Sequence, residues 1–340
     1  MTKKFPLYYI LGALMLLASC ETTVPLDSSI DTEYTIYALA VAGQPVKAHI
    51  SHKLSISMGV AFDHLDLDAF TKQSTDFYKK SLLIDDASVG LTVNGGLTYE
   101  MAYDTTLCCY TSSYTAQPGD ELRIDVAPQV GCKAASTVTQ VPTFAAEVRQ
   151  MAYDVYFDQL ANLADRKWAH NWRDYDAYGA DSLMIISFDF QDPPGERNYY
   201  RLKVRSCNNF KATSHYQGGD SVSTACDVFF SSDPLFYDSR LVKGYGSWSP
   251  YFSNVFDDHS IDGKSYRLTV RSRKRLEPDT FTIIEMQSIS ESLFYYLKSI
   301  QLYRISTDDV YSNPIAIDGN VDDGWGVFGA LNTRTYIIHR

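Results

Sequence analysis

Three common catalytic signatures are missing from this 340-residue sequence. It contains no GxSxG nucleophile elbow, no HExxH zinc motif and no P-loop, the marks of serine hydrolases, zinc proteases and nucleotide-binding enzymes. No CxxC pair occurs, and no histidine stands at a zinc-site spacing from a cysteine. Because a Ser-His-Asp triad can assemble from distant residues, a hydrolase is kept as the least favoured alternative. We expect a protein without enzymatic activity and without a cofactor.

Positive charge is also scarce. The sequence has 30 Lys and Arg residues against 41 Asp and Glu, which gives a formal net charge of −11. Lys3 and Lys4 belong to a segment that we expect to be removed, and their loss takes the charge from −11 to −13. Since the phosphates of nucleic acid repel so acidic a protein, we expect no nucleic-acid partner.

The N-terminal apolar run, residues 5–18, is too short to span a bilayer, which needs about 20 apolar residues. It follows two lysines and precedes small residues, as in a secretory signal. "LASC", which ends at Cys20, resembles the lipobox of bacterial lipoproteins, in which cleavage before the cysteine is followed by acylation with chains such as palmitate. The alternative is an ordinary signal peptide with a chance cysteine. We predict a signal peptide at residues 1–19, a lipidated Cys20 and a tether at residues 20–31.

Lipidation of Cys20 would leave five of the six cysteines. Cys207 and Cys226 flank one loop, and we predict that they form a disulfide, a bond that persists in exported proteins. A loop of this size would contribute about 3 kcal/mol in the chain-entropy model.

The other three cysteines are Cys108, Cys109 and Cys132. Neighbouring residues of a strand point to opposite faces, so only one of the adjacent pair can readily meet Cys132. The sequence leaves open which pairing occurs.

Aromatic residues are abundant, with 25 Tyr and 17 Phe, and they suit the half-buried surface of a β-sheet. "VGLTVNGGLTYEMAY" predicts a hairpin, because Asn-Gly tolerates the positive φ angles of a tight turn. "ELRIDV" alternates, with Leu122, Ile124 and Val126 on one face. We therefore predict an immunoglobulin- or transthyretin-like β-sandwich in residues 32–143.

A second, larger antiparallel β domain is predicted in residues 144–340. "NYYRLKVRS" alternates Tyr200, Leu202 and Val204 with basic residues, and "SYRLTVRS" repeats the pattern. Such alternation is typical of an antiparallel sheet with one face buried and the other in water. We expect the basic side chains to lie on the wet face.

One amphipathic helix is predicted at about residues 288–305. Ser288 and Glu291 fit a capping box at its start. Leu293, Leu297 and Ile300 recur at helical spacing. We expect this apolar stripe to pack on the second sheet.

A tryptophan-rich stretch, "WAHNW", is the first candidate binding site. Trp168 and Trp172 could stack on a glycan or peptide ligand while the Asn171 amide forms hydrogen bonds. The favoured alternative is that these residues cap the sandwich or form the domain interface.

The stretch "DGNVDDG" is the candidate metal site. Asp318, Asn320 and Asp322 alternate as oxygen ligands do in calcium-binding loops. Asp323 stands where an EF-hand requires glycine, and Gly329 stands where it requires glutamate. The site is therefore not a standard EF-hand, and an ordinary polar loop is the favoured alternative.

Several stretches together resemble a known family. They are "CETTVPLD" at the start, "YTSSYTAQPGDELRIDV", "STVTQVP", "NYYRLKV", "SLFYYLKSIQLY" and the closing "NPIAIDGNVDDGWGVFGA". In their order and spacing they resemble domain-of-unknown-function family 4249, over nearly the whole chain after Cys20. The resemblance implies an outer-membrane-associated lipoprotein of Gram-negative bacteria, with no catalytic motif.

Members of that family resemble companions of TonB-dependent outer-membrane receptors, which implies ligand capture or assembly. The leading hypothesis is therefore a lipid-anchored, non-enzymatic binding or accessory protein beside such a receptor. The alternative is a structural or adhesive surface lipoprotein without a transported ligand. The sequence leaves open whether the protein faces the periplasm or the cell exterior.

Overall fold

The computed structural model describes residues 33–52, 83–129, 132–157, 182–208, 229–231, 233–236, 254–273, 280–308 and 316–338. They form strands β1 (Tyr34–Val41), β2 (Pro45–His52), β3 (Val89–Val93), β4 (Thr98–Glu100), β5 (Ala102–Asp104), β6 (Cys109–Thr115), β7 (Glu121–Val126), β8 (Ala135–Gln140), β9 (Val148–Phe157), β10 (Ser182–Gln191), β11 (Tyr199–Asn208), β12 (Phe229–Phe230), β13 (Val255–Asp257), β14 (Ser265–Arg273), β15 (Thr280–Ile289), β16 (Val321–Asp322) and β17 (Gly324–Ile338). Two helices, η3 (Pro234–Phe236) and α6 (Glu291–Asp308), complete the described part. The prediction of a mostly β protein is confirmed.

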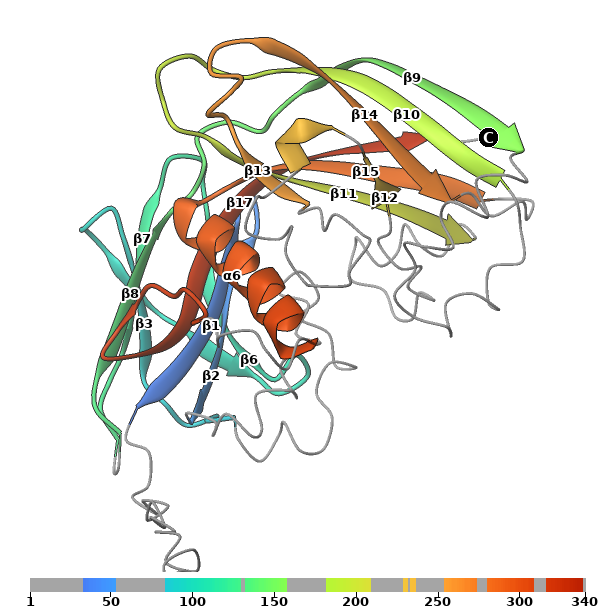
Figure 1. The fold of residues 1–340 in the computed structure, drawn as a ribbon. Coiled ribbons are helices and arrows are strands. Elements are labelled where there is room, and N and C mark those ends of the chain that lie inside the picture. The colour runs from blue at the N-terminus through green and yellow to red at the C-terminus, as the bar shows by residue number, and fades with distance from the viewer. Residues whose placement is uncertain are drawn as a thin grey trace, which may run out of the picture. The chain divides into compact units, whose positions relative to one another are not determined.

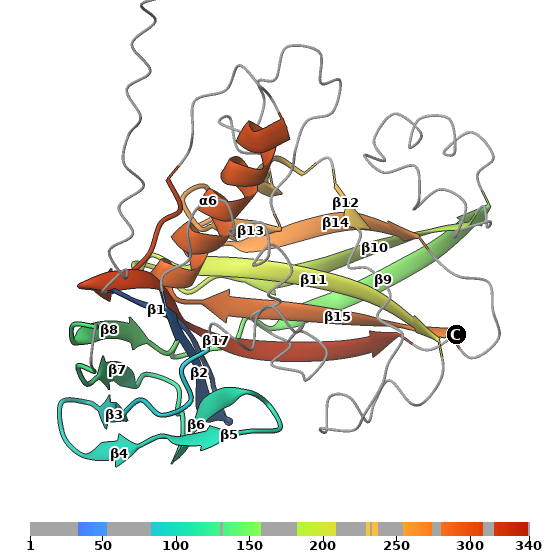
Figure 2. The ribbon, with the colours of Figure 1, turned by 90° about the horizontal axis from the view of Figure 1, so that it is seen from below.

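Three sheets make up the fold (Figure 1). The largest has eight strands in the order β13-β11-β15-β17-β1-β2-β6-β5. The others are a four-stranded sheet, β12-β14-β10-β9, and a five-stranded sheet, β16-β8-β7-β3-β4. In Figure 2 the five-stranded sheet lies near β1, β2 and β6, whereas Figure 1 shows β10 and β14 above β11 and β15. The eight-stranded sheet thus contains strands from residues 32–143 and from residues 144–340. It forms one wall of two sandwich cores.

The longest strand, β17, contributes to both cores. Its even-numbered side chains Phe328 and Ala330 enter the first core, and Ile338 enters the second. The odd-numbered Val327 and Leu331 point to the opposite face, into a third apolar cluster. Because side chains alternate along a strand, one face of the large sheet serves the two sandwiches and the other is available to α6.

A parallel pairing joins the two ends of the folded chain. β1 pairs with β17 in register from Tyr34 opposite Gly324 to Val41 opposite Leu331. Gly326 has a φ of 106°, and a Cβ there would collide with the carbonyl of Ile36. Only glycine allows this close approach, so the start of β17 can lie against β1.

The predicted turns are present. β3 and β4 form the Asn-Gly hairpin, in which Asn94 and Gly95 have φ angles of 51° and 63°. This is the left-handed conformation that such a tight turn requires. The "QDPPGER" turn joins β10 to β11, with Gly195 at a φ of 83°.

Helix α6 begins three residues later than predicted. Ser288 lies in β15, where its hydroxyl accepts a hydrogen bond from the Ala146 backbone N–H at 3.2 Å. Ser290 precedes the helix instead, and its Oγ accepts from the Leu293 N–H at 3.4 Å. The predicted capping box of Ser288 and Glu291 was therefore wrong, because the strand continues through Ser288.

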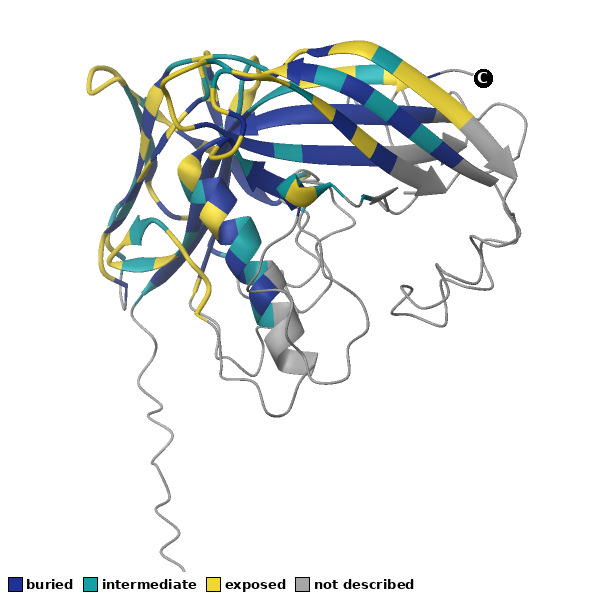
Figure 3. Cartoon of the chain, turned by 45° about the horizontal axis from the view of Figure 1, so that its top comes forward, coloured by how far each residue is buried: buried dark blue, intermediate teal, exposed yellow. Residues whose placement is uncertain are grey.

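The buried stripe of α6 packs on the third apolar cluster (Figure 3). Leu293, Phe294 and Tyr296 are buried there with Tyr199 of β11 and Leu331 of β17. The helix therefore covers one part of the large sheet, on the face opposite the two sandwich cores.

Candidate functional site

Most residues of the predicted sites lie outside the described part of the chain: Cys20, Trp168, Asn171, Trp172 and Cys226. Cys207 is in β11, where its backbone pairs with Phe281, but its side chain is not among those described. The lipidation, the Cys207–Cys226 disulfide and the tryptophan-based site stay predictions.

The three candidate calcium ligands are described, and Asn320 is fully engaged by the backbone. Its Nδ2 donates to the carbonyls of Val138 at 2.7 Å and Phe328 at 3.1 Å. Its Oδ1 accepts from the Phe328 N–H at 2.8 Å. Asp318 and Asp322 are exposed. Calcium coordination by Oδ1 would compete with the Phe328 bond, so Asn320 acts as a clamp on β17.

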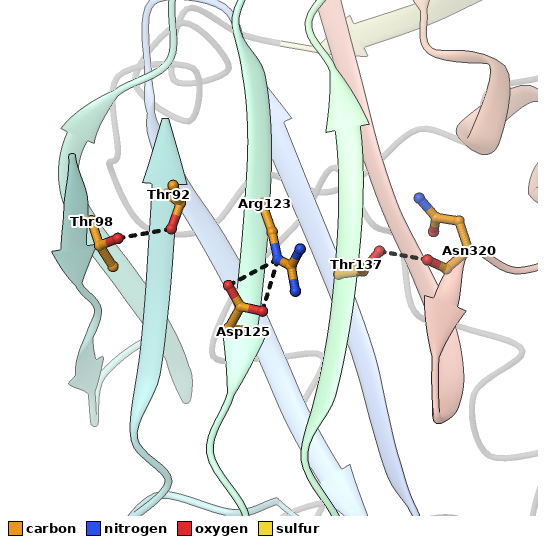
Figure 4. A network of polar contacts seen from close by, with 6 residues as sticks. All are labelled: Thr92, Thr98, Arg123, Asp125, Thr137 and Asn320. Atoms are coloured by element: carbon orange, nitrogen blue, oxygen red, sulfur yellow. Dashed lines mark hydrogen bonds and ion pairs between the residues drawn. The ribbon is translucent and has the colours of Figure 1, made fainter. Parts of the chain in front are cut away.

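The backbone carbonyl of Asn320 is engaged as well (Figure 4). It accepts a hydrogen bond from the Thr137 hydroxyl at 2.8 Å, which ties the loop to β8. The same view shows the Arg123–Asp125 ion pair of β7, which is half exposed. An exposed pair of this kind contributes little to stability.

One group of carboxylates among the described residues could hold a metal ion. Asp192, Asp258 and Asp262 each offer an oxygen, and these oxygens lie within 4.8 Å of one another. They come from the turn after β10 and the turn after β13, so no sequence spacing reveals the group. An all-oxygen set is of the type that calcium prefers.

Hydrogen bonds account for the position of each of these carboxylates. Gly263 N–H donates to Asp192 at 2.9 Å, Gly195 N–H donates to Asp262 at 2.8 Å, and Asn198 N–H donates to Asp258 at 2.7 Å. The two turns are thus bound to each other reciprocally. The three aspartates therefore hold the two turns together through hydrogen bonds, and their positions are explained without a metal ion.

Burial raises the pKa of Asp192, and the neighbouring carboxylates Asp258 and Asp262 raise it further, against the hydrogen bonds that lower it. The Tyr200 hydroxyl donates to Asp192 in a short hydrogen bond. Burial and this bond raise the pKa of Tyr200 in turn. The tyrosine therefore remains a neutral donor and supports the turn.

Polar residues, of which Lys203, Glu285 and Gln287 are buried, form two rows on the α6 side of the large sheet. In the first row, Arg201, Gln287 and Thr333 face one another in register on β11, β15 and β17. In the second, Lys203 is opposite Glu285. We call these five residues the polar rows. They lie next to the apolar row of Tyr199, Ile289 and Leu331 that α6 covers.

The burial of these residues overturns one prediction. Lys203 was expected on a wet face, but it is 2% exposed, and Glu285 and Gln287 are 3% and 4% exposed. The alternation of β11 is as predicted, since Tyr200, Leu202 and Val204 are in the second core. The large sheet, however, is buried on both faces at this position, which alternation in one strand cannot reveal.

The buried side-chain atoms of the polar rows that lack a hydrogen-bond partner include Gln287 Oε1 and Thr333 Oγ1. Buried polar atoms are nearly always hydrogen-bonded, and an unmade bond costs about 1–3 kcal/mol. These two residues are cross-strand neighbours, so their two unsatisfied atoms belong to one part of the sheet. Such a place can bind a polar ligand through hydrogen bonds.

A buried histidine and a buried cysteine belong to neighbouring strands at the other end of the sheet. His49 Nδ1 is 2.9 Å from the Cys108 carbonyl, and burial lowers the pKa of His49 to about 4. Burial raises the pKa of Cys109 to about 11. A nucleophilic cysteine needs a lowered pKa, so this thiol is not activated. Among the described residues, no disulfide joins any two of Cys108, Cys109 and Cys132.

Comparison with known proteins adds one match. No curated protein matches this chain. A family model described as "Domain of unknown function (DUF4249)" matches residues 21–337. The match covers nearly all of the sequence after Cys20, as the quoted stretches predicted. The chain therefore belongs to the DUF4249 family.

Proposed function

We propose that this protein is a lipid-anchored, non-enzymatic binding protein of the outer membrane that works beside a TonB-dependent receptor. The observation that carries the proposal is the pair of polar rows, with two unsatisfied polar atoms on one face of a sheet scaffold. A packed sheet gains nothing from an unmet hydrogen bond, whereas a binding surface uses it when a ligand or partner arrives.

The anchor rests on the lipobox-like "LASC" at residues 17–20. Among the described residues no helix is long and apolar enough to cross a membrane. A tether from residue 20 to residue 31 reaches at most about 40 Å when extended. The anchored protein would thus stay within reach of a neighbouring membrane receptor.

Membrane fractionation tests the anchor. Wild-type protein should remain with the membranes after a salt wash, because acyl chains hold it there. Cys20→Ala should appear in the soluble fraction or as uncleaved precursor. Normal membrane retention of mature Cys20→Ala protein would contradict the anchor.

Affinity purification tests the receptor. The tagged lipoprotein is extracted from outer membranes in mild detergent, and the bound proteins are identified by mass spectrometry. We expect a TonB-dependent receptor in stoichiometric amount. A lipoprotein that comes through alone, even after cross-linking in intact cells, would favour the structural or adhesive alternative.

A further inference from the structure

We propose that two copies of this protein pair with each other through the C-terminal half of β17. In the sheet β17 lies between β1 and β15, but β1 pairs only with Gly324–Leu331, and β15 pairs with Leu331–Ile338. Among the described residues, no strand and no backbone hydrogen bond occupies the outer side of Asn332–Ile338, which we call the free edge. In Figure 2 this half of β17 runs along the border of the large sheet. The inference goes beyond the proposed function and does not involve the receptor.

The backbone groups of alternate residues point out of the free edge. The Leu331 carbonyl accepts a hydrogen bond from the Ala42 N–H at 2.9 Å on the β1 side. The Ala330 carbonyl accepts from the Ser290 N–H at 2.8 Å on the β15 side. Because this direction alternates along a strand, the odd-numbered residues of the free edge present their N–H and carbonyl groups outward. These residues are Thr333, Thr335 and Ile337.

The free edge lacks the features that usually prevent the addition of a strand. Proteins protect their edge strands with prolines, bulges or charges, because unpaired N–H and carbonyl groups attract another strand. The pairing of this segment with β15 has no register shift, and its sequence, NTRTYII, contains no proline. Arg334 is its one charged residue. Thr335 is exposed, and the Ile337 side chain is exposed by 42%.

The sequence of the free edge is complementary to itself, which identifies the occupant as a second copy. A two-fold axis perpendicular to the sheet pairs the edge with its own copy in antiparallel orientation. The register centred on Thr335 uses all seven residues of NTRTYII and places Arg334 opposite Tyr336 of the second copy. A register centred on Arg334 would place two like charges opposite each other, which is destabilising. The centre of the pair is therefore Thr335.

The side chains of this register fit on both faces of the sheet. On one face, the exposed Ile337 side chain packs on Thr333 of the second copy, as β-branched residues do across strands. On the other, the Arg334 guanidinium stacks on the ring of Tyr336 of the second copy. Arg334 lies 4.0 Å from Glu147 in an exposed ion pair, and stacking through the guanidinium face leaves that pair in place.

The pair is weak in dilute solution and forms at high local concentration. Thr335 faces its own copy, and Thr333 faces Ile337 of the second copy in two equivalent places, so the pair contains about six backbone hydrogen bonds. The lipid anchor proposed at Cys20 would confine both copies to one membrane and raise their effective concentration. We therefore expect the pair in the cell envelope and its dissociation when the protein is diluted in detergent.

Disulfide trapping in intact cells tests this inference on the full chain. Thr335→Cys places a thiol opposite its own copy, with the two Cα atoms about 5.5 Å apart, a distance that a disulfide can bridge. After mild oxidation, this variant should migrate mainly as a dimer on a non-reducing gel. Thr333→Cys is the matched control and should give at least tenfold less dimer, because its own copy is about 14 Å away in this register.

A proline connects the trapping to the free edge. Ile337→Pro, added to Thr335→Cys, removes an N–H that points outward and leaves the bonds to β15 in place. The dimer yield should fall at least tenfold while the melting temperature stays nearly unchanged. Ile337→Ala, added to the same variant, keeps the N–H and should retain at least half of the yield.

Three results overturn the inference. They are the absence of a Thr335→Cys dimer, an equal yield from Thr333→Cys, and a yield that Ile337→Pro does not lower. A disulfide between Thr335→Cys and a different, larger protein would also overturn it, because the occupant would then be another partner. Receptor purification without a Thr335→Cys dimer contradicts only the pair, whereas a dimer without a receptor contradicts only the receptor partnership.

Discussion

Acidification should destabilise this protein through His49. The side chain is 6% exposed, and its Nδ1 lies 2.9 Å from the carbonyl of Cys108. Burial lowers the pKa of His49 from 6.5 to about 4; the Cys108 carbonyl opposes this shift and Lys47 adds to it. The folded protein therefore keeps the imidazole neutral at a pH where the unfolded chain takes up a proton. Stability from this group is complete above about pH 6.5 and is lost as the pH falls toward 4.

The size of the effect follows from the difference between the two pKa values. One pKa unit corresponds to about 1.4 kcal/mol, so the complete effect approaches about 3 kcal/mol. Between about pH 7.5 and about pH 5, the free energy of unfolding should fall by about 2 kcal/mol from His49 alone. That is a large fraction of the stability of an ordinary domain.

Urea unfolding at several pH values, followed by circular dichroism, measures this loss. His49→Gln is the test variant, because the amide can donate to the Cys108 carbonyl but does not titrate. Its stability should fall by about 2 kcal/mol less than that of wild type over the same range. Asp192, whose raised pKa gives stability as the pH falls, contributes equally to both proteins and cancels. Parallel pH profiles for the two proteins would refute this account of His49.

Three further predictions concern packing, the Asn320 clamp and the thiols. Gly329→Ala should destabilise the protein by about 1–3 kcal/mol in urea, because the new Cβ would lie 2.9 Å from Leu293 of α6; an unchanged midpoint would contradict the packing. Asn320→Ala should lower the free energy of unfolding by about 2 kcal/mol through lost hydrogen bonds to β8 and β17, and a loss below about 0.5 kcal/mol would argue against the clamp. Unfolding without a reductant should expose all three thiols of the first sandwich to alkylation; peptides joined by a disulfide would show otherwise.

The local features of the fold were predictable from the sequence. The Asn94-Gly95 hairpin and the alternation of Leu122, Ile124 and Val126 depend on neighbouring residues only, and the structure contains both. The single described α-helix was also predicted, although its start at Glu291 lies beyond the predicted Ser288. The limits of an element are harder to predict because a strand and a helix can compete for the same residues.

The long-range features were not predictable. Nothing in the sequence of β1 indicates that it pairs in parallel with β17 from the other end of the chain. The burial of Lys203 depends on that topology, because a basic alternation such as that of β11 usually marks a face in water. Asp192, Asp258 and Asp262 come together through two separate turns. Each of these features is a product of tertiary arrangement.

The polar rows lie on interior strands of the eight-stranded sheet, which fixes their position. β11, β15 and β17 are all interior strands of the eight-stranded sheet, and their other face is buried in the second core. The polar rows are thus held by strands that are fixed on both sides. A site on such strands is positioned more accurately than one on a loop.

The central claim is that this protein works as the binding partner of a membrane receptor. Native mass spectrometry of the tagged lipoprotein, purified from outer membranes in mild detergent, tests it most directly. The account predicts a species whose mass equals one acylated lipoprotein plus one TonB-dependent receptor. A spectrum that contains only the acylated lipoprotein, with the receptor recovered separately from the same membranes, would contradict it.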